Sequence, residues 1–570
     1  MFKWRRKPPK NIEFDEIFMD ASNLPSFNVG RMEGKLELPI KKSSIFIVGA
    51  IFFLVAFWFL TQLYRMQVVE GVAFRERSDN NRIDEALIVA ERGVIYDRSG
   101  ELLAWNESDY EDEHDFPVRA YTDRKGLGQL IGYVSYPQKD AKGFYYRTDY
   151  IGRTGIESAY ESILHGQNGK VLIEVDAHGD VISSSAILSP ISGTAFITSV
   201  DAALSEAMYQ IIATSTAQAG FRSGAGAIMD IKTGEIVALT SFPSYDPEIM
   251  ADGDDVDKIN EYNNDERFPF LNKVVGGAYT PGSVVKPFLA YGALVEKVIS
   301  PNKTIYSNGV LNIPNPYDPD NPSRFTDWRA HGEMTMREAI AFSSNVYFYI
   351  VGGGLPAIAA PQAGTDVMEG LGITRINEYA KLFGLGRKTD IALPGEQEGT
   401  VPNPEWKNRI FNDDWRLGDT YNTAIGQFGF QTTPLQLLRA YAAIGNGGKL
   451  LKPTIKKGQP AEFVDLMLDP SALKIVHEGM RKTVVQDGGT ARSLERKDVT
   501  IAAKSGTAEV SEGNAYVNSW AAGFWPYEKP RYAFILLMDK APRDNALGAT
   551  RIMGEVMEWI SVNRPELIKS

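Results

Sequence analysis

Serine and lysine stand three positions apart at three places in this chain: Ser283–Lys286, Ser300–Lys303 and Ser471–Lys474. On a helix this spacing puts both side chains on one face, where a neutral lysine could take the proton of the serine hydroxyl. Such a lysine must be deprotonated near pH 7, a state that burial and a second nearby cation both favour. The spacing therefore indicates a serine nucleophile activated by lysine.

The composition gives other nucleophiles no support. The 570 residues include no cysteine, which excludes thiol nucleophiles, disulfides and thiolate metal sites. Of the five histidines, His114 and His165 lie in an irregular polar region before the candidate serines, so they are poor triad partners. A serine–lysine mechanism is the one that the residue types favour.

Motif order selects among the candidate pairs. Serine acyl-transferases that recognise penicillin use S-x-x-K, then S-x-N, then K-[ST]-G. No K-[ST]-G follows Ser471, and the copy at Lys232–Gly234 precedes every S-x-x-K and has a simpler role as a hairpin turn. The surviving set is Ser283 or Ser300, Ser343–Asn345 and Lys504–Thr507.

Local context separates the two remaining serines. Ser283 follows Pro281-Gly282 and opens an apolar stretch, which predicts that it stands at a helix N-terminus. Free N–H groups and the positive dipole end at such a terminus suit the stabilisation of an oxyanion. Ser300 lies where that helix should end and precedes Pro301, so a helix-terminating loop explains it. We predict Ser283 as the nucleophile.

The surrounding patterns predict one sheet built from both ends of a large domain. Helical spacing over 203–219 is followed by two strands, 226–231 and 235–240, that form a hairpin. A long, mostly helical region follows over roughly 283–490. Three strand-like runs close the chain at 499–510, 519–525 and 532–538. We expect an α/β (α+β) layered architecture with the helices inserted between the two halves of the sheet.

An uncharged apolar run from Ser44 to Leu63 precedes this domain. Its 20 residues are enough to cross a bilayer as a helix, and no A-x-A cleavage site follows. Nine basic residues precede the run and four follow it closely, a bias that places the N-terminus in the cytoplasm. We predict an uncleaved signal anchor with the catalytic domain outside the cytoplasm.

These features divide the chain into four parts. We predict a cytoplasmic tail over 1–42, a transmembrane anchor over 43–63, a β-rich stem over 64–200 and a catalytic domain over 201–570. The net charge of −12 makes the chain a poor candidate for binding nucleic acid.

Taken together, the motifs resemble those of class B penicillin-binding proteins, the peptidoglycan D,D-transpeptidases. The resemblance implies a five-stranded antiparallel sheet flanked by helices, as in serine β-lactamases, on an elongated stem or pedestal. Two stretches, NPEWKNRIF at 403–411 and GDTYNTAIGQ at 418–427, are most similar to elongation-type members, penicillin-binding protein 2. The other matching stretches are R-G-x-I-x-D-R-x-G at 92–100, GRTGIE at 152–157, FPSYDP at 242–247, YTPGSVVKP at 279–287, GQFGFQTTPLQ at 426–436 and AKSGTAEV at 503–510.

The resemblance implies a role for each matched catalytic residue. Ser283 would be the acylated nucleophile, Lys286 its proton acceptor and Ser343 a relay that carries a proton to the leaving group. Asn345 would hold the amide of the donor peptide. Lys504 would lie across the cleft and help to depress the pKa of Lys286.

The same resemblance places Ser505, Gly506 and Thr507 at the substrate. The two hydroxyls would bind the terminal carboxylate of the donor, and the backbone N–H groups of Ser283 and Thr507 would form the oxyanion hole. Ser283 would attack the penultimate D-Ala of a stem pentapeptide and release D-Ala. An amine of a neighbouring stem peptide would then take the acyl group. β-Lactams, which mimic D-Ala-D-Ala, would acylate Ser283.

Location and partners follow from the resemblance as well. The chain would be a single-pass protein of the inner (cytoplasmic) membrane with a periplasmic or otherwise extracytoplasmic catalytic domain. It would act in cell-wall elongation and cell-shape maintenance, with a SEDS-family glycosyltransferase and other membrane proteins of the elongation complex. No metal or organic cofactor is required.

Two departures from the family pattern affect these expectations. Between Trp105 and Phe116 the stem is short where elongation-type relatives carry a long head insertion, so activation of a partner through that head is in doubt. Some relatives have a zinc site of Asp, His and Cys beside the S-x-N motif. Asp327 and His331 match, but Ser344 stands at the cysteine position. We predict no zinc and an ordinary polar contact between Asp327 and His331.

Two alternatives remain open from the sequence. The same serine could serve a D,D-carboxypeptidase or a membrane-bound β-lactamase in which water is the acceptor. A non-enzymatic alternative is a scaffold of the wall-elongation complex with a dead active site, which the intact motifs disfavour.

Overall fold

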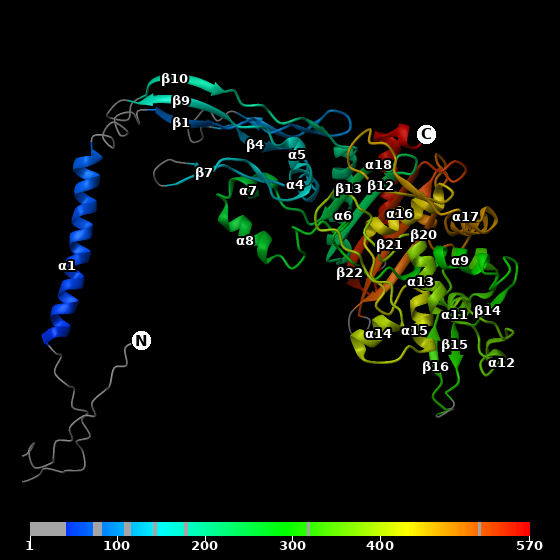
Figure 1. Cartoon of the computed structure of the whole chain (residues 1–570). Helices are drawn as coiled ribbons and strands as arrows, with labels where there is room; N and C mark the ends of the chain where they lie inside the picture. Colours follow the sequence, from blue (N-terminus) through cyan, green and yellow to red (C-terminus); the bar gives the residue numbers. More distant parts are fainter. Residues whose placement is uncertain are drawn as a thin grey trace, which may run out of the picture. The chain divides into compact units, whose positions relative to one another are not determined.

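The computed structural model describes residues 42–71, 83–107, 116–140, 145–175, 181–315, 318, 320–510, 513, 515–545 and 547–569. The chain divides into two compact units (Figure 1), Met1–Asp84 with Glu174–Ile182 and Glu85–Ile173 with Ser183–Ser570. All candidate site residues belong to the second unit. The predicted cytoplasmic tail, except Lys42, lies outside the described residues, as do His114 and most of the shortened head.

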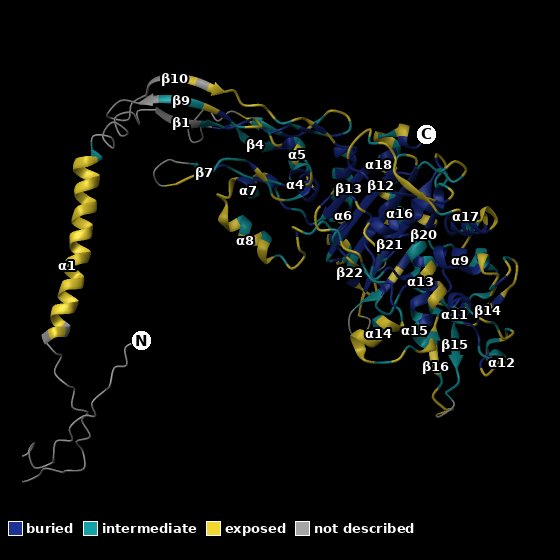
Figure 2. Cartoon of the chain, in the orientation of Figure 1, coloured by how far each residue is buried: buried dark blue, intermediate teal, exposed yellow. Residues whose placement is uncertain are grey.

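The predicted membrane anchor is helical. Helix α1 (Lys42–Tyr64) continues into a π-helical turn, η3 (Arg65–Val69). The segment Ile45–Val69 has a mean hydropathy of 2.3, and by length and composition it could cross a membrane. Its apolar side chains are exposed, which Figure 2 shows in yellow, so no protein core covers them.

The stem is built from short strands and helices. In and just after the motif at 92–100 the chain forms two short strands, β2 (Ile95–Tyr96) and β3 (Leu102–Glu107), which pair antiparallel. The turn between them is closed by the Asp97 carboxylate, which accepts from the backbone N–H groups of Ser99 and Glu101. The remaining elements are β1 (Ile83–Ile88), β4 (Val118–Tyr121), α3 (Gly128–Ile131), β5 (Val134–Ser135), β6 (Gln138–Lys139), β7 (Tyr145–Arg147), β8 (Ile151–Gly152), α4 (Gly155–Ala159), α5 (Glu161–Leu164), β9 (Gly169–Val175), β10 (Val181–Leu188) and β11 (Phe196–Ile197).

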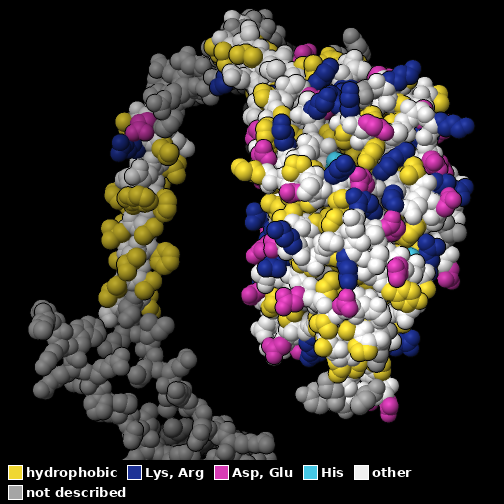
Figure 3. Space-filling model, turned by 90° about the vertical axis from the view of Figure 1, so that its right-hand side faces the viewer, with side chains coloured by type: hydrophobic (Ala, Val, Ile, Leu, Met, Phe, Trp, Pro, Cys, Tyr) yellow, Lys and Arg dark blue, Asp and Glu magenta, His cyan; other side chains and the backbone are white. Residues whose placement is uncertain are grey.

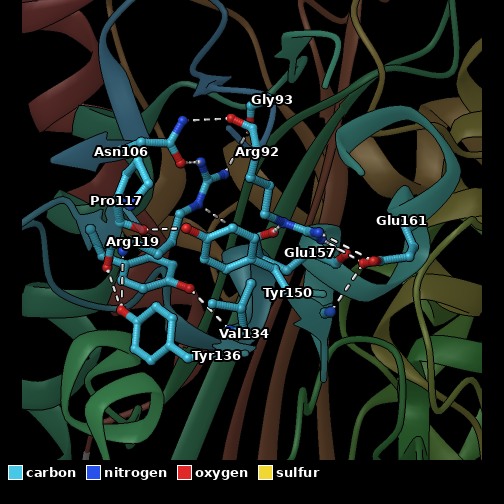
Figure 4. Close-up of polar contacts among 12 residues, drawn as sticks. Arg92, Gly93, Asn106, Pro117, Arg119, Val134, Tyr136, Tyr150, Glu157 and Glu161 are labelled. Carbon is cyan, nitrogen blue, oxygen red and sulfur yellow. Dashed lines mark hydrogen bonds and ion pairs between the residues drawn. The ribbon is translucent and has the colours of Figure 1, made fainter. Parts of the chain in front are cut away.

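A buried ion-pair network joins the two stem motifs (Figure 4). The Glu157 carboxylate accepts from Arg92 Nε at 2.5 Å and from Arg119 Nε at 2.8 Å, and all three side chains are fully buried. Arg92 also donates to the half-buried Glu161 at 2.6 Å. Burial alone would lower the pKa of Arg92, but the two carboxylates outweigh it and raise the pKa. The network therefore fixes the strand motif at 92–100 against the helix motif at 152–157.

The catalytic part contains the predicted sheet from both ends of the domain. Its five strands are antiparallel in the order β13-β12-β22-β21-β20, so β20 is an edge strand. Strands β12 (Ser223–Asp230) and β13 (Ile236–Phe242) form the predicted hairpin, with Lys232–Gly234 in its turn. Strands β20 (Ala502–Val510), β21 (Tyr516–Trp525) and β22 (Tyr532–Pro542) come from the other end, the last two longer than predicted.

Helices cover both faces of this sheet. On one face α6 (Ala202–Ala219) and α18 (Ala549–Asn563) pack with their apolar residues on the strands, and Met208 and Val556 are buried there. On the other face α16 (Pro434–Gly445) lies against β12, β21 and β22, and α17 (Pro470–Val485) lies against β20. Figure 2 shows the strands as the dark-blue centre between these layers. The three-layer packing confirms the expected α/β (α+β) class.

The inserted region is mostly helical, as predicted, but it also holds short strand pairs that the pattern did not indicate. Its elements not yet named are α7 (Pro247–Asp252), α8 (Val256–Asn264), η4 (Gly282–Val285), α9 (Lys286–Val295), β14 (Ile305–Ser307), β15 (Val310–Ile313), β16 (Ser323–Thr326), β17 (Gly332–Met334), α10 (Met336–Ala341), α11 (Asn345–Gly353), α12 (Ala360–Ala363), α13 (Gly372–Leu382), α14 (Pro404–Phe411), α15 (Leu417–Ala424), β18 (Lys449–Leu451) and β19 (Phe463–Asp465).

On the face of the molecule shown in Figure 3, basic and acidic side chains are interspersed.

We predict that Glu157→Gln destabilises the stem strongly. The substitution leaves the buried charges of Arg92 and Arg119 without their shared carboxylate, which costs about 3–5 kcal/mol. Thermal unfolding of the full chain should show the loss. Glu161→Gln is the matched control, because that carboxylate is 34% exposed and pairs with only one of the two arginines, besides accepting from the backbone N–H of Gly152, so its effect should be clearly smaller. Equal effects of the two substitutions would contradict the prediction.

Candidate active site

The loop before Ser283 is held tightly against its neighbours. Gly282 has a φ of +57°, and a Cβ there would lie 2.6 Å from the carbonyl oxygen of Thr507. Its N–H donates to the carbonyl of Gly426 at 3.0 Å. The indole of Trp520 donates to the carbonyl of Thr280 at 3.0 Å. Only glycine fits this position, and the close approach puts Ser283 beside the edge strand β20.

Ser283 stands where the sequence predicts, at the start of the apolar helix. It lies in the 3₁₀ turn η4, which leads directly into α9. The side chain is partly exposed and lines a cleft. Among the described residues the Ser283 hydroxyl makes no hydrogen bond, so it is available to a substrate.

The S-x-x-K and S-x-N motifs meet at the amino group of Lys286. Its Nζ donates to the carbonyl oxygen of Ser343 at 2.8 Å and to Asn345 Oδ1 at 2.8 Å, and it lies 3.5 Å from Ser343 Oγ. Lys286 is completely buried. This burial lowers the pKa of Lys286 to about 7, although the negative charge of Asp327 acts in the opposite direction.

The S-x-N loop has an unusual backbone that aims its side chains. Ser343 is in the left-handed region with a φ of 57°, which costs a non-glycine residue strain. The next residue, Ser344, caps α11: its hydroxyl accepts from Tyr347 N–H and donates to Asp327 Oδ2 at 2.6 Å. The cap turns Ser343 and Asn345 toward Lys286.

Asp327 anchors this loop through several hydrogen bonds. It accepts from the Ser344 hydroxyl and from the backbone N–H of Val346 at 3.0 Å, and Oδ1 lies 3.5 Å from His331 Nε2. Burial would raise the pKa of Asp327, but His331, the charge of Lys286 and the hydrogen bonds lower it to about 2. The predicted contact between Asp327 and His331 is present as a 3.5 Å approach, although His331 Nε2 makes no hydrogen bond among the described residues. Ser344 donates to Asp327, so its hydroxyl is used as a structural partner; that the chain binds no zinc stays a prediction.

Lys504 lies on β20 and is also fully buried. Its Nζ donates to the carbonyl of Ser505 at 2.8 Å. Burial and the charge of Lys286 both lower the pKa of Lys504 well below its usual value. The family resemblance implied that Lys504 would help to lower the pKa of Lys286, whereas in the structure it is the charge of Lys286 that lowers the pKa of Lys504. In the structure burial is the main cause for both lysines.

The other predicted residues line one cleft of about 780 Å³. Ser283, Ser343 and Asn345 line it together with Ser505, Gly506 and Thr507, while the two lysines are buried and do not belong to its lining. The structure adds residues that the sequence did not single out. Thr490 bonds to the Ser505 hydroxyl at 2.6 Å, and no motif marked it. Further lining residues are Arg324, Trp328, Tyr349, Asn422, Gln427, Phe428, Glu509 and Arg543.

The rejected candidates lie outside this cleft. Ser300 follows the end of α9 in a turn, as predicted. Ser471 is exposed near the start of α17, where its hydroxyl bonds to the capping Asp469. Lys232 is exposed in the β12–β13 turn. None of the three contributes to the cleft lining.

More than half of the chain matches the domain models of one protein family. Residues 224–558 match the penicillin binding protein transpeptidase domain, and residues 114–197 match the penicillin-binding protein dimerisation domain. The chain belongs to the penicillin-binding protein transpeptidase family.

Within this family several similar proteins are of the penicillin-binding protein 2 type, which confirms the resemblance seen in the motifs. The peptidoglycan D,D-transpeptidase MrdA of Haemophilus influenzae is 27% identical, with 88% of each chain covered. A penicillin-binding protein 2 of Helicobacter pylori, solved in complex with MreC, superposes with a TM-score of 0.68 at 26% identity and covers 84% of this chain and 98% of its own. A structure described as a peptidoglycan synthase complex that coordinates polymerization and crosslinking gives a TM-score of 0.68 at 25% identity, covering 91% and 97%.

We predict that Asp327→Asn destabilises the S-x-N loop in a pH-dependent way. Losing hydrogen bonds to a charged acceptor should cost about 2 kcal/mol at pH 7. The folded-state pKa of Asp327 is depressed from 3.8 to about 2, so its stabilisation is complete above 3.8 and is lost as the pH falls toward 2. The difference in thermal unfolding between wild type and variant should therefore shrink below pH 4. Asp366→Asn, at an exposed ion pair, should change little at either pH; a pH-independent loss in Asp327→Asn would argue against the assignment.

Proposed function

We propose that this chain is a serine-type D,D-transpeptidase that cross-links peptidoglycan stem peptides in cell-wall elongation and cell-shape maintenance, and that it is a target of penicillin. The single observation that carries the proposal is the meeting of three motifs in one cleft. Ser283 lines this cleft three residues before a buried lysine, Lys286, whose amino group contacts both Ser343 and Asn345. The family and the similar transpeptidases support the same reaction class.

The first half-reaction forms the acyl-enzyme. Ser283 Oγ attacks the carbonyl carbon of the penultimate D-Ala, and its proton passes to the neutral amine of Lys286. The carbon–nitrogen bond to the terminal D-Ala then breaks. Ser343, 3.5 Å from Lys286 Nζ, relays a proton to the departing amine. The products are D-Ala and an ester on Ser283.

The second half-reaction transfers the acyl group. An amine of a neighbouring stem peptide attacks the ester carbon, the bond to Ser283 Oγ breaks, and the serine regains a proton as the amine loses one. Asn345 holds the donor amide, and its position is set by bonds to Lys286 and to the Thr326 carbonyl. Both half-reactions use only groups of the chain and its substrates.

Residues of β20 bind the charged end of the substrate. The hydroxyls of Ser505 and Thr507 bind the terminal carboxylate of the donor, and the amino group of Lys504 lies behind them, where it donates to the carbonyl of Ser505. The backbone N–H groups of Ser283 and Thr507 stabilise the oxyanion of the tetrahedral intermediate. Gly506 is needed between them because a Cβ there would lie 2.8 Å from Val284. The proposed oxyanion hole is supported by the close approach of Gly282 to Thr507.

The proposal also covers the membrane location of the protein and its partners. We place α1 in the inner membrane with residues 1–42 in the cytoplasm, the anchor at 43–63, the stem over 64–200 and the catalytic domain over 201–570 outside. The basic residues before the span support this orientation. The similar protein solved with MreC and the similar synthase complex support a membrane partner, for which a SEDS-family glycosyltransferase is our candidate. β-Lactams bind at Ser283.

We predict that Ser283→Ala abolishes covalent labelling by a fluorescent penicillin. The acyl bond cannot form without the hydroxyl, so a gel assay of the purified full chain should show a band for wild type and none for the variant. The rejected serines supply matched controls, and Ser300→Ala and Ser471→Ala should label like wild type. A label that survives Ser283→Ala, or a wild type that takes no label, would favour the scaffold.

We predict that the acylation rate rises with pH through about 7 and then levels off. Lys286 must be neutral to accept a proton, and burial lowers its pKa to about 7. Stopped-flow acylation by a penicillin between pH 5 and 9 measures the profile. Lys303→Ala should keep this profile, whereas Lys286→Ala should lose about 10³-fold or more in rate. A rate that falls on passing from pH 6 to 8 would overturn the role of Lys286.

Transpeptidation and hydrolysis are separated by the product. Wild type incubated with a donor peptide and an amine acceptor should form cross-linked product and free D-Ala. Hydrolysed tetrapeptide without cross-linked product would instead identify a carboxypeptidase.

A further inference from the structure

A pair of opposite charges stands at the cleft beyond the proposed carboxylate site. Glu509 Oε1 accepts from Arg543 Nη2 at 2.9 Å, and both side chains line the same cleft as Ser283. The side chains are 38% and 60% exposed, so a ligand can reach both. The proposed mechanism uses neither residue.

The edge strand β20 determines which part of a substrate reaches this pair. Ser505, Thr507 and Glu509 are alternate residues of the strand, so they follow one another along one face at about 6.6–6.8 Å intervals. In the other direction Lys504 and the two alanines before it are completely buried and offer no surface. A peptide whose terminal carboxylate is bound at Ser505 and Thr507 must therefore extend toward Glu509.

The register of an extended peptide then selects one residue. Two residues of an extended chain span about 6.6 Å, which is the step from Thr507 to Glu509. The third residue from the C-terminus of the donor accordingly lies level with Glu509 and Arg543. Glu509 also lines a second cavity of about 470 Å³, together with Asp539 and Lys540, which gives a long side chain room to extend.

We propose that Glu509 and Arg543 recognise a zwitterionic side chain on the third residue of the donor, one that ends in an ammonium and a carboxylate on the same carbon. The proposal rests on the proposed function and adds the class of donor. Glu509 accepts from the ammonium and Arg543 donates to the carboxylate, so each charge of the pair exchanges one partner for another. A diaminopimelate residue has this terminus, whereas a lysine residue has the ammonium alone and leaves Arg543 without a carboxylate from the substrate.

Penicillins with designed side chains test this without the need for a second substrate. The first compound has an acyl side chain that ends in an ammonium and a carboxylate on one carbon; the second lacks only that carboxylate, and the third lacks only that ammonium. The measured quantity is the ratio of second-order acylation rates at Ser283 in the full chain. Wild type should prefer the zwitterionic compound over the second by about tenfold, as expected for one charge-assisted pair.

Variants assign each charge to its residue. Arg543→Gln should bring the ratio of the first compound to the second close to one, and Glu509→Gln should do the same for the first compound against the third. The double variant Glu509→Arg/Arg543→Glu keeps both charges and should recover part of the preference. Arg551→Gln, an exposed arginine on α18 outside the cleft lining, is the matched control and should keep the wild-type ratio.

The outcomes separate this inference from the proposed function. If every penicillin acylates wild type at equal rates, or if Arg543→Gln keeps the wild-type ratio, the pair is an ordinary surface ion pair and the inference fails. If no penicillin acylates Ser283, the proposed function fails as well. Measuring ratios within each variant makes the result independent of any general loss of activity.

Discussion

The burial of two lysine side chains, Lys286 and Lys504, is the constraint on which the proposed catalytic cleft depends. An ammonium group in such a place loses its hydration, and two of them repel each other, so the neutral form becomes accessible near pH 7. Lys286 keeps two good hydrogen bonds, to the Ser343 carbonyl and to Asn345, which hold its amino group in place when uncharged. The fold therefore prepares the proposed base before any substrate arrives.

The need to hold Lys286 and Ser283 in place explains the strained backbone of Ser343 and the close packing around Gly282. The left-handed backbone of Ser343 aims its carbonyl at Lys286, and Asp327 holds the loop through Ser344. Gly282 lets the turn that carries Ser283 lie directly against β20. These are contacts between segments far apart in the sequence, and each one brings a motif to the cleft.

Much of this could be predicted from the sequence because the chemistry is encoded in short spacings. The interval between Ser283 and Lys286, the hairpin turn at Lys232 and the β-patterns near the end of the chain each depend on neighbouring residues only. Thr490 and Arg543 escaped prediction, since their importance arises from where a distant segment places them. The buried pair of Arg92 and Glu157 is intermediate: both motifs were noticed, but only the fold shows that they contact each other.

The strand order of the sheet also constrains how the protein is made. Strand β12 lies between β13, its neighbour in the chain, and β22, which follows about 300 residues later. Until the segment through β22 has been synthesised, the edge of β12 that β22 later pairs with is bare and α6 covers an incomplete layer. Such open edges attract other strands. An unfinished domain is therefore exposed to wrong strand pairing until β22 is in place, and a chain that stalls before that point would be prone to aggregation.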